Sequence, residues 1–226
     1  MQAALNGRGA AVARRMAEWN ESLRAVSPNS QDAPFLTNHD MARARGMLRS
    51  DMDAMKTVAM LYLLLPGRPF IYYGEELGMS GSGRDENKRL PMLWSAADEG
   101  ENCLPPAEAD QKQRLKAGVA EQEADADSLL HWYRRLIALR ALSPELAHGD
   151  MTALDAGHEA VCAFTVTDGT TVAVLINASR TETASLDMAA LGLEGIEVLG
   201  CVGTDAEAVL AGRLPPMCCA VARLTE

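Results

Sequence analysis

Residues 52–76, "MDAMKTVAMLYLLLPGRPFIYYGEE", contain a helical pattern followed at once by a strand pattern. The apolar residues of the first part recur at spacings of three and four, which is typical of one buried helix face. That face is expected to carry Met52, Met55, Val58, Ala59, Tyr62 and Leu63. Ser50 or Asp51 would cap the helix, and Pro66 and Gly67 would end it. The following run, "RPFIYYGEE", is aromatic and β-branched, and it has the length of a strand.

A similar pair of elements precedes this stretch. Residues 9–26 carry apolar side chains on one predicted helix face, namely Val12, Met16, Trp19, Leu23 and Val26. The turn-forming run "SPNSQDAP" breaks this helix, and residues 34–37 then suit a short buried strand. A helix followed by a strand, twice over, predicts a parallel α/β sheet.

Two further segments differ in character. Residues 78–114 are rich in Gly, Pro and charge and lack periodicity, so they are expected to form a functional or disordered loop. "DSLLHWYRRLIALRAL" then restores a helical pattern, with Asp127 or Ser128 as its cap. Its predicted buried positions are Leu129, Leu130, Trp132, Tyr133, Leu136, Ile137, Leu139 and Leu142.

The last 75 or so residues follow a different pattern, with short alternating runs such as "AVCAFTVTD" and "TTVAVLINAS" between turn formers. They predict a small antiparallel β domain, resembling a sandwich. The expected boundary lies near Gly149, which gives an α/β domain over 1–148 and a β domain over 149–226.

The composition excludes some classes of partner. The chain has 226 residues, 48% of them hydrophobic, and a formal net charge of -10. It has no Lys/Arg cluster for a phosphate backbone, so a nucleic-acid partner is not expected. The N-terminal run contains Arg residues and no uninterrupted apolar segment, so neither a signal peptide nor a membrane span is expected. The five cysteines lack zinc-site spacing and are interpreted as mostly buried thiols.

Polar clusters follow both predicted strands. Asn38, His39 and Asp40 come after the first strand, and "GEE" follows the second. Because the carboxyl ends of parallel strands meet at one rim, both clusters would face the same side, where ligand chemistry occurs in such folds. A carboxylate beside an imidazole suits a hydroxyl-rich ligand. The alternative is that Asn38 or Asp40 caps a turn and His39 is an ordinary loop residue.

The amino-acid sequences of several segments favour a ligand-binding role for these polar residues. "FLTNHDMAR", "PGRPFIYYGEELGMSGSGRDENKRLPMLW" and "VAEQEADADSLLHWYRRLIALR", in this order, resemble the C-terminal half of the alpha-amylase family of glycoside hydrolases. The likeness is strongest to its bacterial alpha-amylase and oligoglucosidase-like members. It implies the last part of a (β/α)8 TIM barrel, followed by the C-terminal β domain that the family carries.

The resemblance also implies roles for individual residues. Asp40 matches the catalytic carboxylate that stabilises the transition state, and His39 matches the histidine that hydrogen-bonds the sugar at the cleavage subsite. Asn38 and Arg43 lie in the same motif and are expected to take part in substrate binding. Arg89 of "DENKR" resembles an arginine that contacts sugar in oligoglucosidase-like members.

The nucleophile and the general acid of the family lie upstream of "NHD", where this sequence has only 37 residues and no strand motif with an Asp. A full barrel needs about 250 residues, so the chain is expected to be part of a longer retaining alpha-glycoside hydrolase and inactive alone. Glu75, Glu76, Asp85 and Glu86 are alternative carboxylates, but "GEE" is expected to fix the loop through hydrogen bonds.

Two other functions stay open: a non-catalytic carbohydrate-binding or interaction module, and a piece of an enzyme with no function of its own. The expected ligand is an alpha-glucan or an oligosaccharide. No cofactor or metal is expected in this chain, although calcium is an option for the longer enzyme. An uncovered barrel edge and the apolar face of helix 9–26 predict a homo-oligomer.

Overall fold

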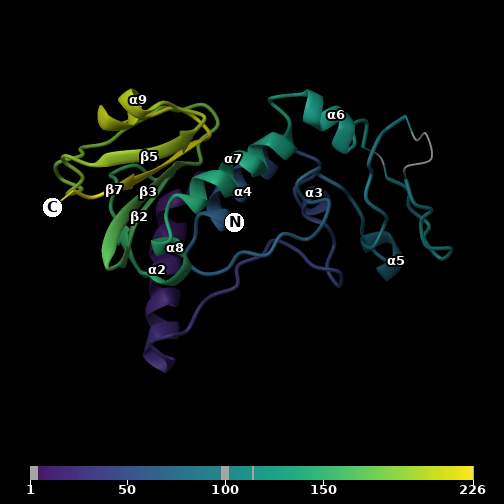
Figure 1. The fold of residues 1–226 in the computed structure, drawn as a ribbon, viewed down its shortest axis with the longest axis horizontal. Helices are drawn as coiled ribbons and strands as arrows, with labels where there is room; N and C mark the ends of the chain where they lie inside the picture. Colours follow the sequence, from purple (N-terminus) through teal and green to yellow (C-terminus); the bar gives the residue numbers. More distant parts are fainter. Residues whose placement is uncertain (1–4, 98–101, 114, 226) are drawn as a thin grey trace. The chain divides into compact units, whose positions relative to one another are not determined.

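The computed structural model describes residues 5–97, 102–113 and 115–225. The chain divides into two compact units (Figure 1). The first contains residues 1–34, 57–69 and 135–226, and the second contains residues 35–56 and 70–134. Two helices, α4 (Met52–Leu63) and α7 (Leu129–Ala141), continue from one unit into the other.

The first unit contains the predicted antiparallel β domain. Its five-stranded sheet has the order β1-β2-β3-β7-β5, and every neighbouring pair is antiparallel. The strands are β1 (Asp150–Leu154), β2 (Val161–Asp168), β3 (Thr170–Asn177), β5 (Glu197–Val202) and β7 (Cys218–Arg223). A two-stranded sheet pairs β4 (Ala184–Ser185) with β6 (Arg213–Leu214), and α9 (Ala206–Leu210) lies between β5 and β6 in the sequence.

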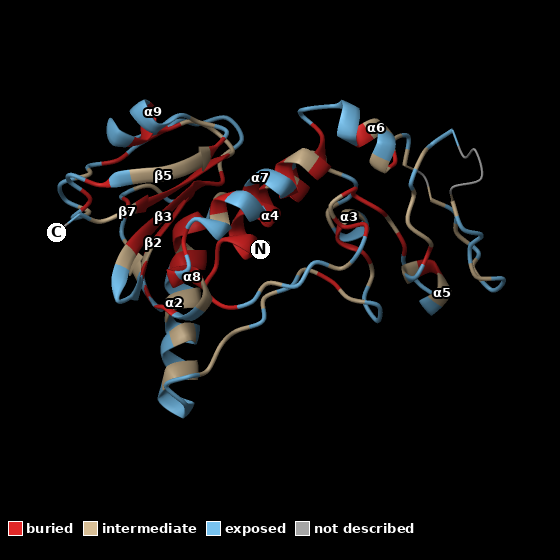
Figure 2. Cartoon of the chain, viewed as in Figure 1, coloured by how far each residue is buried: buried red, intermediate tan, exposed pale blue. Residues whose placement is uncertain are grey.

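The central strands of this sheet are buried on both faces (Figure 2). One face contributes Val161 of β2 and Leu175 of β3 to a core that also contains Leu193 and, from α9, Val209. Helices α2 (Gly9–Val26) and α8 (Glu145–His148) contact β2. Burial on two sides explains why Val161–Phe164 and Val172–Asn177 are continuously buried instead of alternating.

Helix α2 has the predicted bounds, but only its first half is buried. Gly9 approaches the sheet so closely that an added Cβ would lie 2.3 Å from the Ala160 carbonyl oxygen. Further along, Trp19 is 45% exposed and Val26 is 86% exposed, so part of the apolar face predicted for this helix is uncovered. The predicted self-association through this face remains a prediction.

Helices α4 and α7 confirm the sequence-based caps. Asp51 accepts a hydrogen bond from the Ala54 amide at 3.0 Å, and Ser128 accepts one from the His131 amide at 3.2 Å. Both side chains accept hydrogen bonds from backbone amides that the first turn of a helix leaves without an intrahelical partner. In α7, the predicted positions are buried except for Ile137, and Leu142 beyond the helix is exposed as well.

The second unit forms less regular structure than predicted. Instead of two strands over 34–37 and 70–73, one parallel bridge joins Phe35 to Phe70. Both phenylalanines are exposed, at 48% and 62%. Two short extended segments cannot form a stable ladder by themselves, since a strand needs partners and a covered face. Parallel pairing is therefore confirmed at one position only.

The remainder of this unit consists of short helices and the long loop predicted over 78–114. The helices are α3 (Ala44–Met47), α5 (Asp85–Lys88) and α6 (Val119–Ala124). Leu77, Met79, Leu90 and Leu130 form a small core that anchors the loop on the start of α7. Part of the predicted loop, 98–101 and 114, lies outside the described residues.

The division of the chain at Gly149 remains a prediction. Strand β1 begins at Asp150, yet the compact unit that contains the sheet also includes α2 and the segment 57–69. Cys162, Cys218 and Cys219 are buried, Cys201 is partly buried and Cys103 is exposed, so the interpretation of mostly buried thiols is confirmed. Among the described residues, we find no helix long and apolar enough to cross a membrane.

Candidate active site

Asp40 lies in a tight turn at the end of the first extended segment. The Asp40 amide donates to the side-chain oxygen of Asn38 at 2.9 Å, and the Met41 amide donates to the Asn38 carbonyl at 3.3 Å. This is the Asx turn that the structural alternative predicted for Asn38. The turn leaves the Asp40 side chain 66% exposed, with His39 Nε2 3.3 Å from Asp40 Oδ2. The turn therefore presents a carboxylate and an imidazole side by side.

Arg89 approaches Asp40 from the loop after Gly74. It follows α5, and its Nη2 lies 3.3 Å from Asp40 Oδ1 and 3.6 Å from Asp85 Oδ2. The structure thus brings together three of the predicted site residues, Asp40, His39 and Arg89. All three side chains are open to solvent, as a site for an external ligand requires.

Lys88 completes this cluster, and the sequence analysis did not single it out. Its Nζ donates to the Asp40 carbonyl oxygen at 3.0 Å and pairs with Asp85 Oδ1 at 3.0 Å. The hydrogen bond and charge of Lys88, together with the charge of Arg89, lower the pKa of the Asp85 carboxyl. The spacing of Asp85, Lys88 and Arg89 at three and four is the signal that indicates a shared helix face.

Arg43 lies beneath this cluster and is only 1% exposed. Its guanidinium stacks on the Tyr72 and Tyr73 rings, 4.5 and 4.6 Å from their centroids. It donates to the Tyr73 carbonyl at 2.6 Å and to the Lys88 carbonyl at 3.0 Å. Burial lowers the pKa of Arg43, while burial and the neighbouring Tyr73 raise that of Tyr72. All of these contacts of Arg43 are with other groups of the protein, and its predicted contact with substrate remains a prediction.

The two glutamates of "GEE" occupy protein-facing positions. Glu75 is 3% exposed and accepts hydrogen bonds from the Tyr133 hydroxyl at 3.0 Å and the Thr37 hydroxyl at 3.4 Å. These bonds agree with the predicted loop-fixing role, and both of these partners are hydroxyl groups. Burial raises the pKa of Glu76, whose Oε2 has no hydrogen-bond partner among the described residues.

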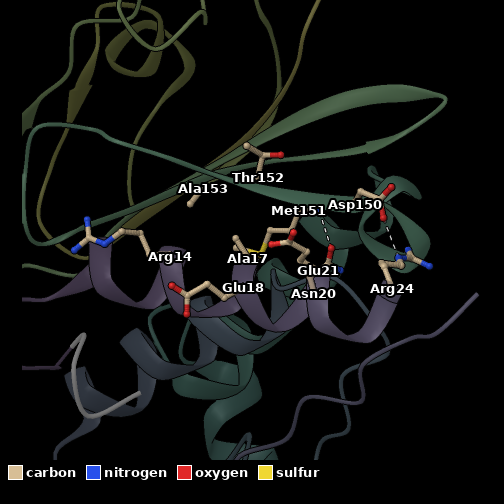
Figure 3. A pocket seen from close by; sticks show the side chains of 10 residues that line it. All are labelled: Arg14, Ala17, Glu18, Asn20, Glu21, Arg24, Asp150, Met151, Thr152 and Ala153. Carbon is tan, nitrogen blue, oxygen red and sulfur yellow. Dashed lines mark hydrogen bonds and ion pairs between the residues drawn. The ribbon is translucent and has the colours of Figure 1, made fainter. Parts of the chain in front are cut away.

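Other parts of the described chain offer less for a ligand. A cavity of about 580 Å³ lies between α2 and β1 (Figure 3). Arg24 and Asp150 in its wall pair at 2.9 Å, and none of its lining residues is aromatic, so it offers no ring for a sugar to stack on. In residues 5–97, 102–113 and 115–225, we find no group of three or more His, Cys, Asp or Glu side chains that could hold a metal.

Comparison with known proteins identifies the family. Residues 6–149 match the family model "Alpha amylase, catalytic domain". The chain is 36% identical over 149 residues to alpha-amylase SusG of Bacteroides thetaiotaomicron, covering 65% of this chain and 21% of that protein. It is 32% identical over 192 residues to an alpha-amylase of Streptomyces lividans, covering 78% and 20%.

A solved structure extends the likeness to nearly the whole chain. Amy13B of Eubacterium rectale superposes with a TM-score of 0.87 and 27% identity, covering 99% of this chain and 46% of that one. The chain therefore spans less than half of this solved structure and about a fifth of the two relatives above. The matching catalytic-domain model covers well over half of the 226 residues. This chain belongs to the alpha-amylase family, with the C-terminal part of a (β/α)8 barrel domain followed by an antiparallel β domain.

Proposed function

We propose that this chain supplies the transition-state-stabilising carboxylate, Asp40, of a retaining alpha-glycoside hydrolase that acts on alpha-glucans or maltooligosaccharides. One observation carries the proposal. The turn at Asn38 holds Asp40 in the open, with His39 and Arg89 each 3.3 Å from one of its carboxylate oxygens. Membership of the alpha-amylase family and the alpha-amylase names of its relatives support this reaction class.

The chemistry explains why such a cluster is useful. Retaining hydrolysis passes through a transition state with oxocarbenium character, in which positive charge develops on the sugar ring. A fixed carboxylate binds that state more tightly than the neutral ground state, because its interaction strengthens as the charge grows. His39 can donate a hydrogen bond to a ring hydroxyl, and Arg89 can bind further hydroxyl groups beside it.

Asp40 cannot perform the whole reaction by itself. A retaining enzyme needs a nucleophilic carboxylate and a protonated acid about 5 Å apart. Glu75 is occupied by two hydroxyl donors in a buried site, and Asp85 pairs with Lys88 and Arg89. We therefore propose that the nucleophile and the acid come from outside this chain, and that the chain alone does not cleave glucans.

Hydrolysis assays test the proposal in two steps. The 226-residue chain, incubated with maltooligosaccharides, should release no reducing ends above background. In a longer enzyme that contains this chain, Asp40→Asn should lower kcat by about 100-fold or more, with a much smaller change in substrate binding. Equal losses in binding and turnover would contradict the role of Asp40. Turnover by the chain alone that disappears in Asp40→Asn would show that a second carboxylate is present here.

The alternative function is a carbohydrate-binding module without catalysis. The exposed cluster of Asp40, His39 and Arg89 could bind a glucan in either case, because it offers both hydrogen-bond donors and acceptors. Binding of maltooligosaccharides by the longer protein, with no reducing ends released, would favour this alternative.

A further inference from the structure

Arg43 links the two segments that form the Asp40 cluster. It lies three residues after Asp40, and its amide donates to the Gly81 carbonyl at 2.9 Å. Gly81 also packs closely on the backbone just before Lys88, because an added Cβ there would lie 2.0 Å from the Asn87 carbonyl oxygen. The Arg43 side chain then reaches the carbonyl of Lys88. One residue therefore joins the Asp40 turn to the loop that carries Lys88 and Arg89.

The carbonyl of Lys88 is the centre of this link. It accepts hydrogen bonds from Arg43 Nε at 3.0 Å and from the Tyr72 hydroxyl at 3.2 Å. The Lys88 side chain in turn donates to the Asp40 carbonyl, and the next residue, Arg89, contacts the Asp40 carboxylate. Fixing the Lys88 backbone therefore fixes both cationic groups beside Asp40.

Burying a charge is costly, and among the described residues no ion pair joins a carboxylate to Arg43, although the charge of Glu76 acts in favour of its charged form. Arg43 retains its place through two carbonyl acceptors and two aromatic rings, and its Nη2 has no hydrogen-bond partner among the described residues. A planar guanidinium can stack its face on a ring while its edge donates hydrogen bonds, whereas a lysine ammonium has no planar face to stack.

We propose that Arg43 is the positioning residue of the Asp40 cluster and not a direct sugar ligand, an inference that rests on the proposed function of Asp40. Arg43 holds the Lys88 backbone so that Arg89 and Lys88 meet the Asp40 turn. Its loss would move these groups away from Asp40 while the carboxylate itself remains in the chain.

Three variants of the 226-residue chain test this role: Arg43→Met, Arg43→Lys and the control Arg45→Met. Arg45 lies on α3, the short helix that begins directly after Arg43. It donates to the Gly78 carbonyl at 3.1 Å, and its described bonds include none to Tyr72, Tyr73 or Lys88. The first readout is the set of backbone amide shifts for 38–41 and 85–89 by nuclear magnetic resonance. The second is the affinity for a glucose-configured imino sugar in its protonated form, compared with neutral maltose.

We expect both Arg43 variants to shift the amides of 38–41 and 85–89, and Arg45→Met to leave them in place. Arg43→Met should weaken binding of neutral maltose by about tenfold and Arg43→Lys by less, because Lys88 and Arg89 would no longer be held where they can donate to its hydroxyl groups. The effect on the cationic imino sugar should be smaller, because its attraction to Asp40 grows as these two cations move away. If Arg43→Met does not fold, the lysine variant decides. Shifts confined to the immediate neighbours of residue 43, or equal shifts in the Arg45 control, would overturn the proposal. If the unaltered chain does not bind the imino sugar, the function of Asp40 fails, whereas the amide shifts still decide the positioning role.

Discussion

Replacing Arg140 by methionine should strongly destabilise the first compact unit. Arg140 lies near the end of α7, and its guanidinium donates to four carbonyl oxygens, those of Leu63, Leu65, Gly67 and Leu146. Two of these distances are 2.7 and 2.8 Å, from Nη1 to the carbonyls of Leu65 and Leu63. The carbonyl oxygens at the end of α4 and in the turn after it therefore receive these hydrogen bonds from one donor side chain, whereas the Leu146 carbonyl also accepts from the Gly67 amide at 2.8 Å.

The size of the effect follows from these bonds. A hydrogen bond to a charged group contributes about 1.5 to 3 kcal/mol, and a buried carbonyl left unpaired costs about 1 to 3 kcal/mol. Methionine also removes a buried charge, and burial already lowers the pKa of Arg140 to about 10. This relief offsets part of the loss, so we expect a net decrease of about 3 to 5 kcal/mol in the free energy of unfolding.

Urea unfolding followed by circular dichroism measures this change, with Arg134→Met as the matched control. Arg134 lies on the same helix, but its side chain is half exposed and pairs with Glu123 on the surface. Such a pair contributes about 0 to 1 kcal/mol. A loss below about 1 kcal/mol for Arg140→Met, or equal losses for both variants, would contradict the dependence of the Leu63, Leu65 and Gly67 carbonyls on this guanidinium.

Two further predictions concern titratable groups. A thiol reagent should label the exposed Cys103 in the folded chain. Cys162 and Cys218 should react only on unfolding, because burial raises the pKa of each thiol to about 12. Rapid labelling of all thiols in the folded chain would contradict this. Glu76→Gln should stabilise the chain at neutral pH, because burial raises the pKa of Glu76 in the folded state above its unfolded pKa of 4.5. With glutamate, the stability that is present below pH 4.5 is lost as the pH rises through the folded-state pKa, whereas glutamine does not ionise. Melting curves at several pH values check this, and a variant with the same pH dependence as the unaltered chain would contradict it.

Helices could be predicted from the sequence where the pattern is local. The apolar spacing of α4 and α7 and the polar residues Asp51 and Ser128 act within a few positions, and the structure has both caps. The burial of individual residues was less predictable. Ile137 has the same apolar character as its buried neighbours, yet it is 46% exposed, because exposure depends on which elements pack nearby. The prediction of a strand over 34–37 was wrong for a similar reason, since the pairing of a strand depends on residues that are distant in the sequence.

Some residues of the candidate site could be predicted from the sequence, and others could not. The motif "NHD" and the arginine of "DENKR" could be found from residue identity, and the structure places Asp40, His39 and Arg89 together. Lys88 was missed because it binds the backbone oxygen of Asp40, a contact that residue types do not encode. The burial of Arg43 could not be predicted either, since arginine is rarely buried without a specific set of partners.

Binding of a cationic sugar mimic to the 226-residue chain tests the central claim about Asp40 most directly. Isothermal titration calorimetry would compare the protonated glucose-configured imino sugar with neutral maltose, for the unaltered chain and for Asp40→Asn. A carboxylate that stabilises positive charge predicts tighter binding of the imino sugar, and a loss of about tenfold or more in Asp40→Asn with little change for maltose. Equal affinity for the imino sugar in both chains would contradict the claim that Asp40 stabilises a charged transition state.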